Sequence, residues 1–153
     1  APALLPAAAI AQGSRPAELV FAVVPAENAA GVTERYNPFV EYMSRALGTR
    51  VTLRVASDYA AVIEGQRSGS IHVAYYGPAS YARAFITGVK VEPFVTARNA
   101  DGSLGFYSVT YVLAKSPYQK IADLKGKTLG LVDPNSTSGN QAPRFFLNRD
   151  GYD

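Results

Sequence analysis

The 153-residue chain contains no cysteine, no tryptophan, one methionine and one histidine. Without cysteine, the chain cannot have a disulfide framework, a thiolate metal site or a cysteine nucleophile. The single histidine, His72, has no cluster of carboxylates near it in the sequence, so we expect no zinc site, no other metal and no cofactor. A lone histidine inside the strand-like run 71–76 is more typical of a structural or surface residue.

Charge is also sparse. Fifteen Lys and Arg against twelve Asp and Glu leave a net charge of +3, and the basic residues do not form a run. Nucleic-acid-binding proteins concentrate positive charge on one face, so we expect no nucleic-acid partner and only a weak bias towards anionic ligands. The chain is nevertheless rich in hydrophobic residues, at 48%, with seven Phe and ten Tyr, which is typical of a folded domain.

The two ends of the chain have unusual features. Residues 1–11 are apolar, uncharged and too short to span a bilayer, and polar residues follow at once. Because Ala9-Ile10-Ala11 fits a small-x-small cleavage site, we predict a signal-peptide remnant at 1–11 and a mature, exported chain from near Gln12; a disordered Ala/Pro leader is the alternative. The chain stops within what reads as the first turns of a helix, after Phe145-Phe146-Leu147, which predicts a fragment.

Hydrophobic runs and turn residues predict an alternation of strands and helices. The predicted strands are 19–24, 51–55, 71–76, 91–97, 106–114 and 127–132. The predicted helices are 36–47, 59–67, one that begins at Gly77-Pro78, a short turn at 121–125, and one after Ser136. This alternation predicts an α/β fold with a mainly parallel sheet. Ligands of such sheets lie beyond the carboxyl ends of the strands, which draws attention to the loops 57–59, 76–78 and 133–139.

The segment 133–139, Asp-Pro-Asn-Ser-Thr-Ser-Gly, carries the most chemical information. It joins a predicted strand to a predicted helix, where free backbone N–H groups and the helix dipole favour an anion. Three consecutive hydroxyls and a glycine add donors without bulk, so a tetrahedral oxyanion could be held here. A simple helix cap would have the same composition, and the residues alone leave both open. The chain has no Walker-type loop, dinucleotide fingerprint or nucleophile elbow.

The order of these pieces resembles one known family. The motifs are Asp58-Tyr59-Ala60, Tyr75-Tyr76-Gly77, the segment 100–103 (Ala-Asp-Gly-Ser) and the segment 133–139. Together they resemble the phosphonate-binding periplasmic proteins of ABC importers, in the phosphate, phosphite and phosphonate-binding group. The resemblance implies a type 2 periplasmic binding protein of two lobes, with most of lobe 1 in 12–105 and the crossover and incomplete start of lobe 2 in 106–153.

The resemblance also implies ligand contacts. Tyr59 matches a ligand-contacting tyrosine, Ser136 and Thr137 match the hydroxyls that hold the phosphonate oxygens, and Ser138 and Gly139 complete the helix start. A second contacting tyrosine of the family falls on Phe106, and the neighbouring Tyr107 is the residue that could compensate. Tyr76 is a further candidate because it ends a strand just before Gly77-Pro78; the alternative is that it packs as an amphipathic plug.

The implied function is capture of phosphonate, phosphite or phosphate in the periplasm by cleft closure, and delivery to an ABC permease in the inner membrane. No catalytic residue and no cofactor are expected. Two alternatives remain open from the residues: a periplasmic oxyanion sensor for a signalling receptor, and an enzyme on the same fold.

Overall fold

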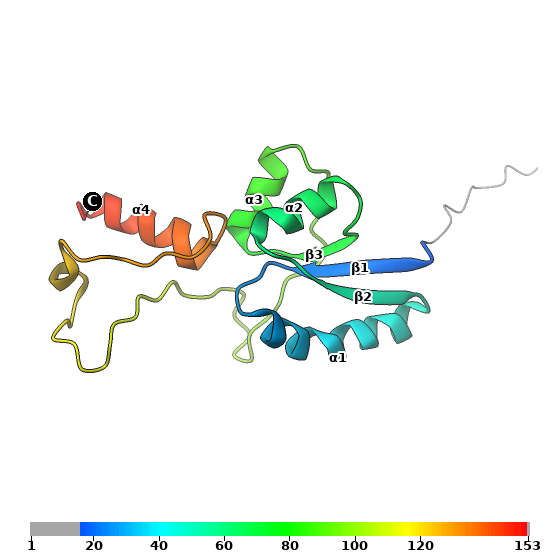
Figure 1. Cartoon of the computed structure of the whole chain (residues 1–153), viewed down its shortest axis with the longest axis horizontal. Coiled ribbons are helices and arrows are strands. Elements are labelled where there is room, and N and C mark those ends of the chain that lie inside the picture. The colour runs from blue at the N-terminus through cyan, green and yellow to red at the C-terminus, as the bar shows by residue number, and fades with distance from the viewer. Residues whose placement is uncertain (1–15, 153) are drawn as a thin grey trace, which may run out of the picture.

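The computed structural model describes residues 16–152, so the predicted signal-peptide remnant and the start near Gln12 lie outside the described residues. A three-stranded parallel sheet in the order β2-β1-β3 forms the centre of the larger body (Figure 1). Its strands are β1 (Glu18–Val23), β2 (Arg50–Val55) and β3 (Val73–Tyr75). The predicted α/β class with a parallel sheet is confirmed.

Residues 16–152 contain four α-helices: α1 (Ala29–Leu47), α2 (Tyr59–Arg67), α3 (Pro78–Ile86) and α4 (Ala142–Arg149). Helix α1 covers one face of the sheet, and α2 and α3 lie on the other (Figure 1). Successive side chains of a strand point to opposite faces. Phe21 and Val23 of β1 therefore pack with α1, whereas Ala22 between them packs with Val62 of α2.

Side-chain caps set where two of these helices begin. The Asn28 side-chain oxygen accepts a hydrogen bond from the N–H of Gly31 at 2.9 Å, at the start of α1. At the start of α2, the Asp58 carboxylate accepts a hydrogen bond from the N–H of Ala61 at 2.7 Å. Each bond satisfies a donor that has no partner within its helix. Helix α3, in contrast, is preceded by Gly77 and has no side-chain cap of its own.

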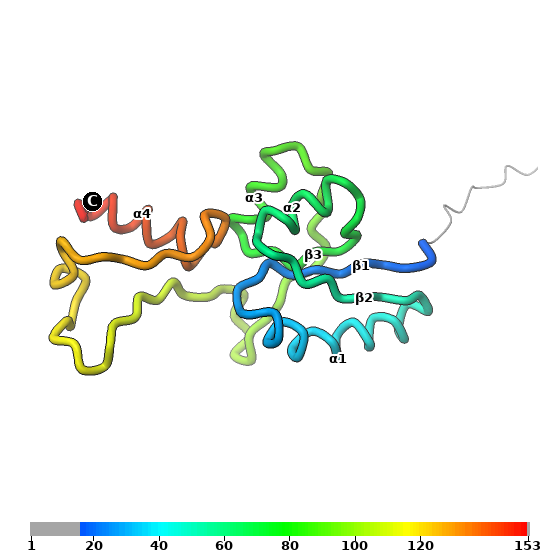
Figure 2. The backbone as a smooth tube through the Cα atoms, in the orientation of Figure 1, coloured from blue at the N-terminus to red at the C-terminus, as the bar shows by residue number. Residues whose placement is uncertain are grey.

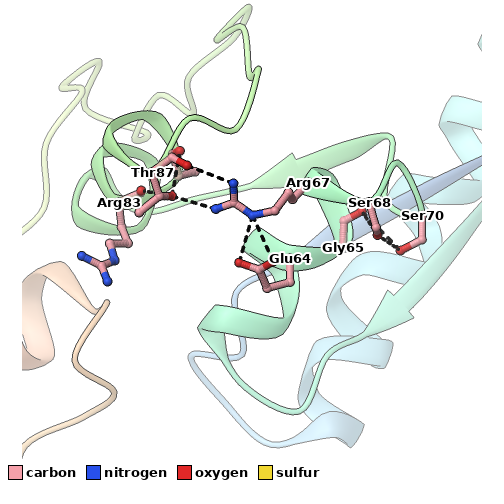
Figure 3. Close-up of polar contacts among 8 residues, drawn as sticks. Glu64, Gly65, Arg67, Ser68, Ser70, Arg83 and Thr87 are labelled. Atoms are coloured by element: carbon pink, nitrogen blue, oxygen red, sulfur yellow. Dashed lines mark hydrogen bonds and ion pairs between the residues drawn. The ribbon is translucent and has the colours of Figure 1, made fainter.

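The three parallel strands end at one edge of the sheet, and α2 and α3 both begin there. The far ends of these two helices are tied together by Arg67 (Figure 3). Its Nε donates to the Glu64 carboxylate at 3.0 Å, and its two terminal nitrogens donate to the carbonyl and hydroxyl oxygens of Thr87 at 2.9 and 3.0 Å. These bonds fix α2 and α3 relative to each other. The segment 133–149 lies beyond the sheet edge at which both helices begin (Figure 2).

Three predicted strands, 91–97, 106–114 and 127–132, are not strands in the structure. The chain there makes a long excursion away from the sheet, with one 3₁₀ turn at Ile121–Leu124 (Figure 2). A strand needs a neighbour for its backbone N–H and C=O groups, and these segments find none within residues 16–152. Their alternating apolar side chains are consequently exposed, Tyr111 to 85% and Leu113 to 83%.

His72 has a structural role. Its backbone N–H donates to the carbonyl of Val20 at 3.0 Å, and its ring Nδ1 accepts from the N–H of Val20 at 3.0 Å. The His72 side chain thus adds a hydrogen bond to β1 at the position just before β3 begins. His72 is exposed and bonded to β1, in agreement with the prediction of a structural or surface residue.

Candidate functional site

The loop that follows Val132 is closed by its own hydrogen bonds. The Asp133 carboxylate accepts from the backbone N–H of Asn135 at 2.7 Å and from its side-chain amide at 3.2 Å. The N–H of Ser136 donates to the carbonyl of Asp133 at 2.8 Å. Asp is favoured in such turns because its short side chain reaches the backbone two residues on. The turn delivers the chain to Ser136 in an extended conformation, at the cap of a new helix.

The first turn of that helix is a π-helical turn, Thr137–Gln141, which continues directly into α4. The Ser136 hydroxyl accepts from the N–H of Gly139 at 3.3 Å, and the carbonyl of Ser136 accepts from the N–H of Gln141 at 3.0 Å. A π-helical turn is wider than an α-helical turn and is rare in proteins. Where such turns occur, they are often at functional sites. This turn places Thr137, Ser138 and Gly139 in the first, positively polarised turn of the helix.

A second set of contacts closes the loop across its base. The N–H of Val132 donates to the carbonyl of Gly139 at 2.9 Å, and the side-chain amide of Asn140 donates to the carbonyl of Val132 at 2.6 Å. Asn140 is 4% exposed, and its oxygen accepts from Arg144 Nε at 3.0 Å. A Cβ at Gly139 would stand 2.5 Å from Cγ2 of Val132, so this position requires glycine for close approach.

The loop also contacts earlier parts of the chain. The Thr137 hydroxyl accepts from the N–H of Ala79, in the first turn of α3, at 2.8 Å. The Ser108 hydroxyl donates to the carbonyl of Ser138 at 2.6 Å. The structure thus brings the predicted loops 76–78 and 133–139 together, and it places residue 108 beside them. The neighbouring Tyr107 is 91% exposed.

The predicted tyrosines lie in different surroundings. Tyr59 is the first residue of α2 and is 5% exposed, and its hydroxyl makes no hydrogen bond with another described residue. Tyr76 packs against the hydrophobic clusters formed by β1, α2 and α3, and its hydroxyl is buried without a partner in the described part of the chain. Burial raises the pKa of Tyr76 to about 12. The roles of Tyr59, Tyr76 and Tyr107 in ligand binding stay predictions.

A hollow of about 1010 Å³ lies beside α4, lined by residues 107–113 and 124–132 together with Ser138 and Gly139. Ser136 and Thr137 do not line it, and its walls are largely the apolar segments that the sequence predicts as strands. Within residues 16–152, no three His, Asp or Glu side chains gather as metal ligands, and no helix is long and apolar enough to cross a bilayer.

Sequence reasoning found the hydroxyl run but missed the residues that hold it. Asn140 and Ser108 bind backbone carbonyls of the loop, and Ala79 offers only its backbone N–H. Glycine at position 77 allows this approach, since a Cβ there would stand 3.2 Å from the Thr137 hydroxyl. The Gly-Pro pair before α3 was the one available signal, and it indicates a helix start rather than a contact.

The described residues thus form an α/β domain in which a parallel sheet ends beside a capped, hydroxyl-rich loop. Comparison with known proteins identifies the family. Residues 21–153 match the family described as "ABC transporter, phosphonate, periplasmic substrate-binding protein". The chain belongs to this family.

Individual relatives agree with this assignment. The chain is 34% identical over 140 residues to the phosphate-import protein PhnD of Mycolicibacterium smegmatis, covering 89% of this chain and 43% of that protein. It is 34% identical over 133 residues to the phosphonates-binding periplasmic protein of Escherichia coli, covering 84% of this chain and 39% of the relative. The chain therefore spans about two fifths of the length of these curated relatives.

Solved structures show the same fold. The binding protein component of an ABC phosphonate transporter from Pseudomonas aeruginosa superposes with a TM-score of 0.82 at 28% identity, covering 89% of this chain and 46% of that one. PhnD1 of Prochlorococcus marinus, solved in complex with methylphosphonate, superposes with a TM-score of 0.71 at 22% identity and covers 91% of this chain and 52% of that one. The predicted type 2 periplasmic binding protein fold, present here in part, is confirmed.

Proposed function

We propose that this chain is part of an exported, periplasmic solute-binding protein that captures a small phosphorus oxyanion, phosphonate, phosphite or phosphate, and presents it to an ABC permease in the inner membrane. Family membership and the names of the relatives support this class of protein. The proposed mechanism is closure of a cleft around the ligand, which favours the closed state by contacts that the open state lacks. The proposed function includes no catalytic step.

One observation carries the proposal: the hydroxyl-rich loop meets the start of α3. Ser136 and Thr137 each accept a hydrogen bond from a backbone N–H, and neither hydroxyl proton has an acceptor among the described residues. Both hydroxyls are therefore available to donate to an anionic oxygen. Ser138 and the N–H groups of the turn add donors at the positive end of the helix dipole.

The three tyrosines proposed as ligand contacts differ in how well their surroundings support that role. Tyr59 has a hydroxyl without a hydrogen-bond partner in the described residues, at the sheet edge where α2 begins. Tyr107 is exposed and adjoins Ser108, which is bonded to the loop. Tyr76 has the least support, because its hydroxyl is buried among hydrophobic side chains.

The test is calorimetric titration of the longest form of the protein that its gene encodes with methylphosphonate, phosphite and phosphate. Ser136→Ala and Thr137→Ala should each weaken binding about tenfold to a hundredfold, because a hydrogen bond to a charged group contributes about 1.5–3 kcal/mol. Ser70→Ala, at the opposite end of α2, is the matched control and should leave affinity unchanged. Unchanged affinity of both loop variants, with lowered melting temperatures, would show that the loop is only a helix cap.

A further inference from the structure

The contact between Thr137 and Ala79 joins two segments 58 positions apart in the sequence. Helix α3 begins after Gly77, which has no side chain to cap it, and the first N–H groups of a helix have no partner within it. The Thr137 hydroxyl supplies the missing acceptor at 2.8 Å from the N–H of Ala79. Thr137 therefore caps α3 from outside the helix.

This contact also restricts the directions in which the Thr137 hydroxyl proton can point. A hydroxyl has one proton to donate and two lone pairs that accept. One lone pair is directed to the N–H of Ala79, so the proton points elsewhere, and within residues 16–152 it has no acceptor. The Thr137 hydroxyl is thus restricted in rotation and available as a donor before any ligand arrives, which lowers the entropic cost of binding.

We propose that Ala79 is a positioning residue for ligand binding: its backbone N–H orients the Thr137 hydroxyl as a donor to the anion and thereby couples occupancy of the loop to its contact with α3. This inference rests on the proposed function. Gly77 supports the same contact because it has no side chain. A Cβ at this position would stand 3.2 Å from the Thr137 hydroxyl oxygen and would displace it. The backbone of Gly77 has φ −80°, so alanine is conformationally tolerated and a substitution tests the contact itself.

A double-mutant cycle tests the coupling, by titration of the longest natural form of the protein with methylphosphonate and phosphate. Ala79→Pro removes the N–H at a helix position that tolerates proline, and Thr137→Val removes the hydroxyl at nearly constant shape. We expect Thr137→Val to weaken binding about tenfold or more and Ala79→Pro about threefold to tenfold. The double variant should bind no more weakly than Thr137→Val within about twofold. Thr137→Ser, which keeps the hydroxyl, should retain most of the affinity.

Two outcomes would overturn the inference: losses that multiply in the double variant, or an Ala79→Pro variant that binds as tightly as the unchanged protein. If Ala79→Pro does not fold in a thermal melt, Gly77→Ala decides instead. It should weaken binding at least about threefold, whereas the control Gly31→Ala, where the added methyl meets only the flexible Glu27 side chain, should not. Equal affinities of these two variants would also overturn the inference.

The same titrations separate this inference from the proposed function. If the unchanged protein binds none of the anions, the proposed function fails and the positioning role fails with it. If the unchanged protein binds and the losses multiply, the positioning role alone fails.

Discussion

Replacing Tyr76 with phenylalanine should stabilise the protein. The Tyr76 hydroxyl is buried without a hydrogen-bond partner among the described residues, and the ring packs between the clusters around Val62 and Ile63. A buried polar group left without a partner costs about 1–3 kcal/mol. Removing the oxygen while keeping the ring should therefore raise the free energy of unfolding by about 1 kcal/mol or more at pH 8.

The stability difference should also grow in alkali. Burial raises the pKa of Tyr76 from 10.0 to about 12 in the folded protein. The unfolded chain therefore ionises first as the pH rises, and the folded state, which holds the neutral hydroxyl, loses stability between pH 10 and pH 12. At about 1.4 kcal/mol per pH unit, the loss reaches about 2–3 kcal/mol over this window and is absent from the phenylalanine variant.

The assay is urea-induced unfolding at pH 8, 10 and 11 of the unchanged protein, Tyr76→Phe, and the exposed control Tyr42→Phe. The control should stay within about 0.5 kcal/mol of the unchanged protein at pH 8. The Tyr76→Phe advantage should increase by about 1 kcal/mol between pH 10 and 11. A variant less stable than the unchanged protein, or an advantage that does not change with pH, would refute the burial argument. Loss of phosphonate affinity would show instead that the hydroxyl reaches the ligand.

Two further predictions concern the loop and its supporting helix. Gly139→Ala should lower the free energy of unfolding by about 1–3 kcal/mol, because the new methyl would overlap Val132. It should also weaken anion binding in the calorimetric titration. Unchanged stability and affinity would contradict the close approach of Gly139 to Val132. Asp58→Ala should cost about 1 kcal/mol in urea unfolding through loss of the cap on α2, and a cost near zero would show that the cap is not formed in solution.

Much of the sheet could be predicted because its signals are local. Residues 19–24 form a continuous apolar run, Gly48 ends α1 at φ 61°, and Asp58 caps α2 through a residue three positions on. The apolar segments 106–114 and 127–132 carry equally clear strand patterns. They were predicted wrongly because a strand also depends on a neighbour, and hydrophobic pattern does not specify which partner is available.

The candidate site divides in the same way. The hydroxyls of Ser136 and Thr137 were visible as a run of donors at a helix start. The groups that position them were not, because Ser108 and Ala79 act on the loop from 30 and 58 positions away. Ala79 acts through its backbone, which has no side-chain signature at all. Only the three-dimensional meeting of α3 with the loop shows its contact with Thr137.

In the hydrogen bonds that hold this loop, its oxygens act as acceptors, as the hydroxyl of an ordinary helix cap does. Two bonds reach it from distant parts of the chain, 58 and 30 positions earlier, and in both the loop accepts: the Thr137 hydroxyl from Ala79, and the Ser138 carbonyl from Ser108. The Ser136 hydroxyl also accepts, from Gly139. Because the oxygens of Ser136 and Thr137 accept in these bonds, their hydroxyl protons have no acceptor among the described residues. These protons lie at the positive end of a helix. An oxyanion bound at this position, as we propose, would accept from several of these donors at once.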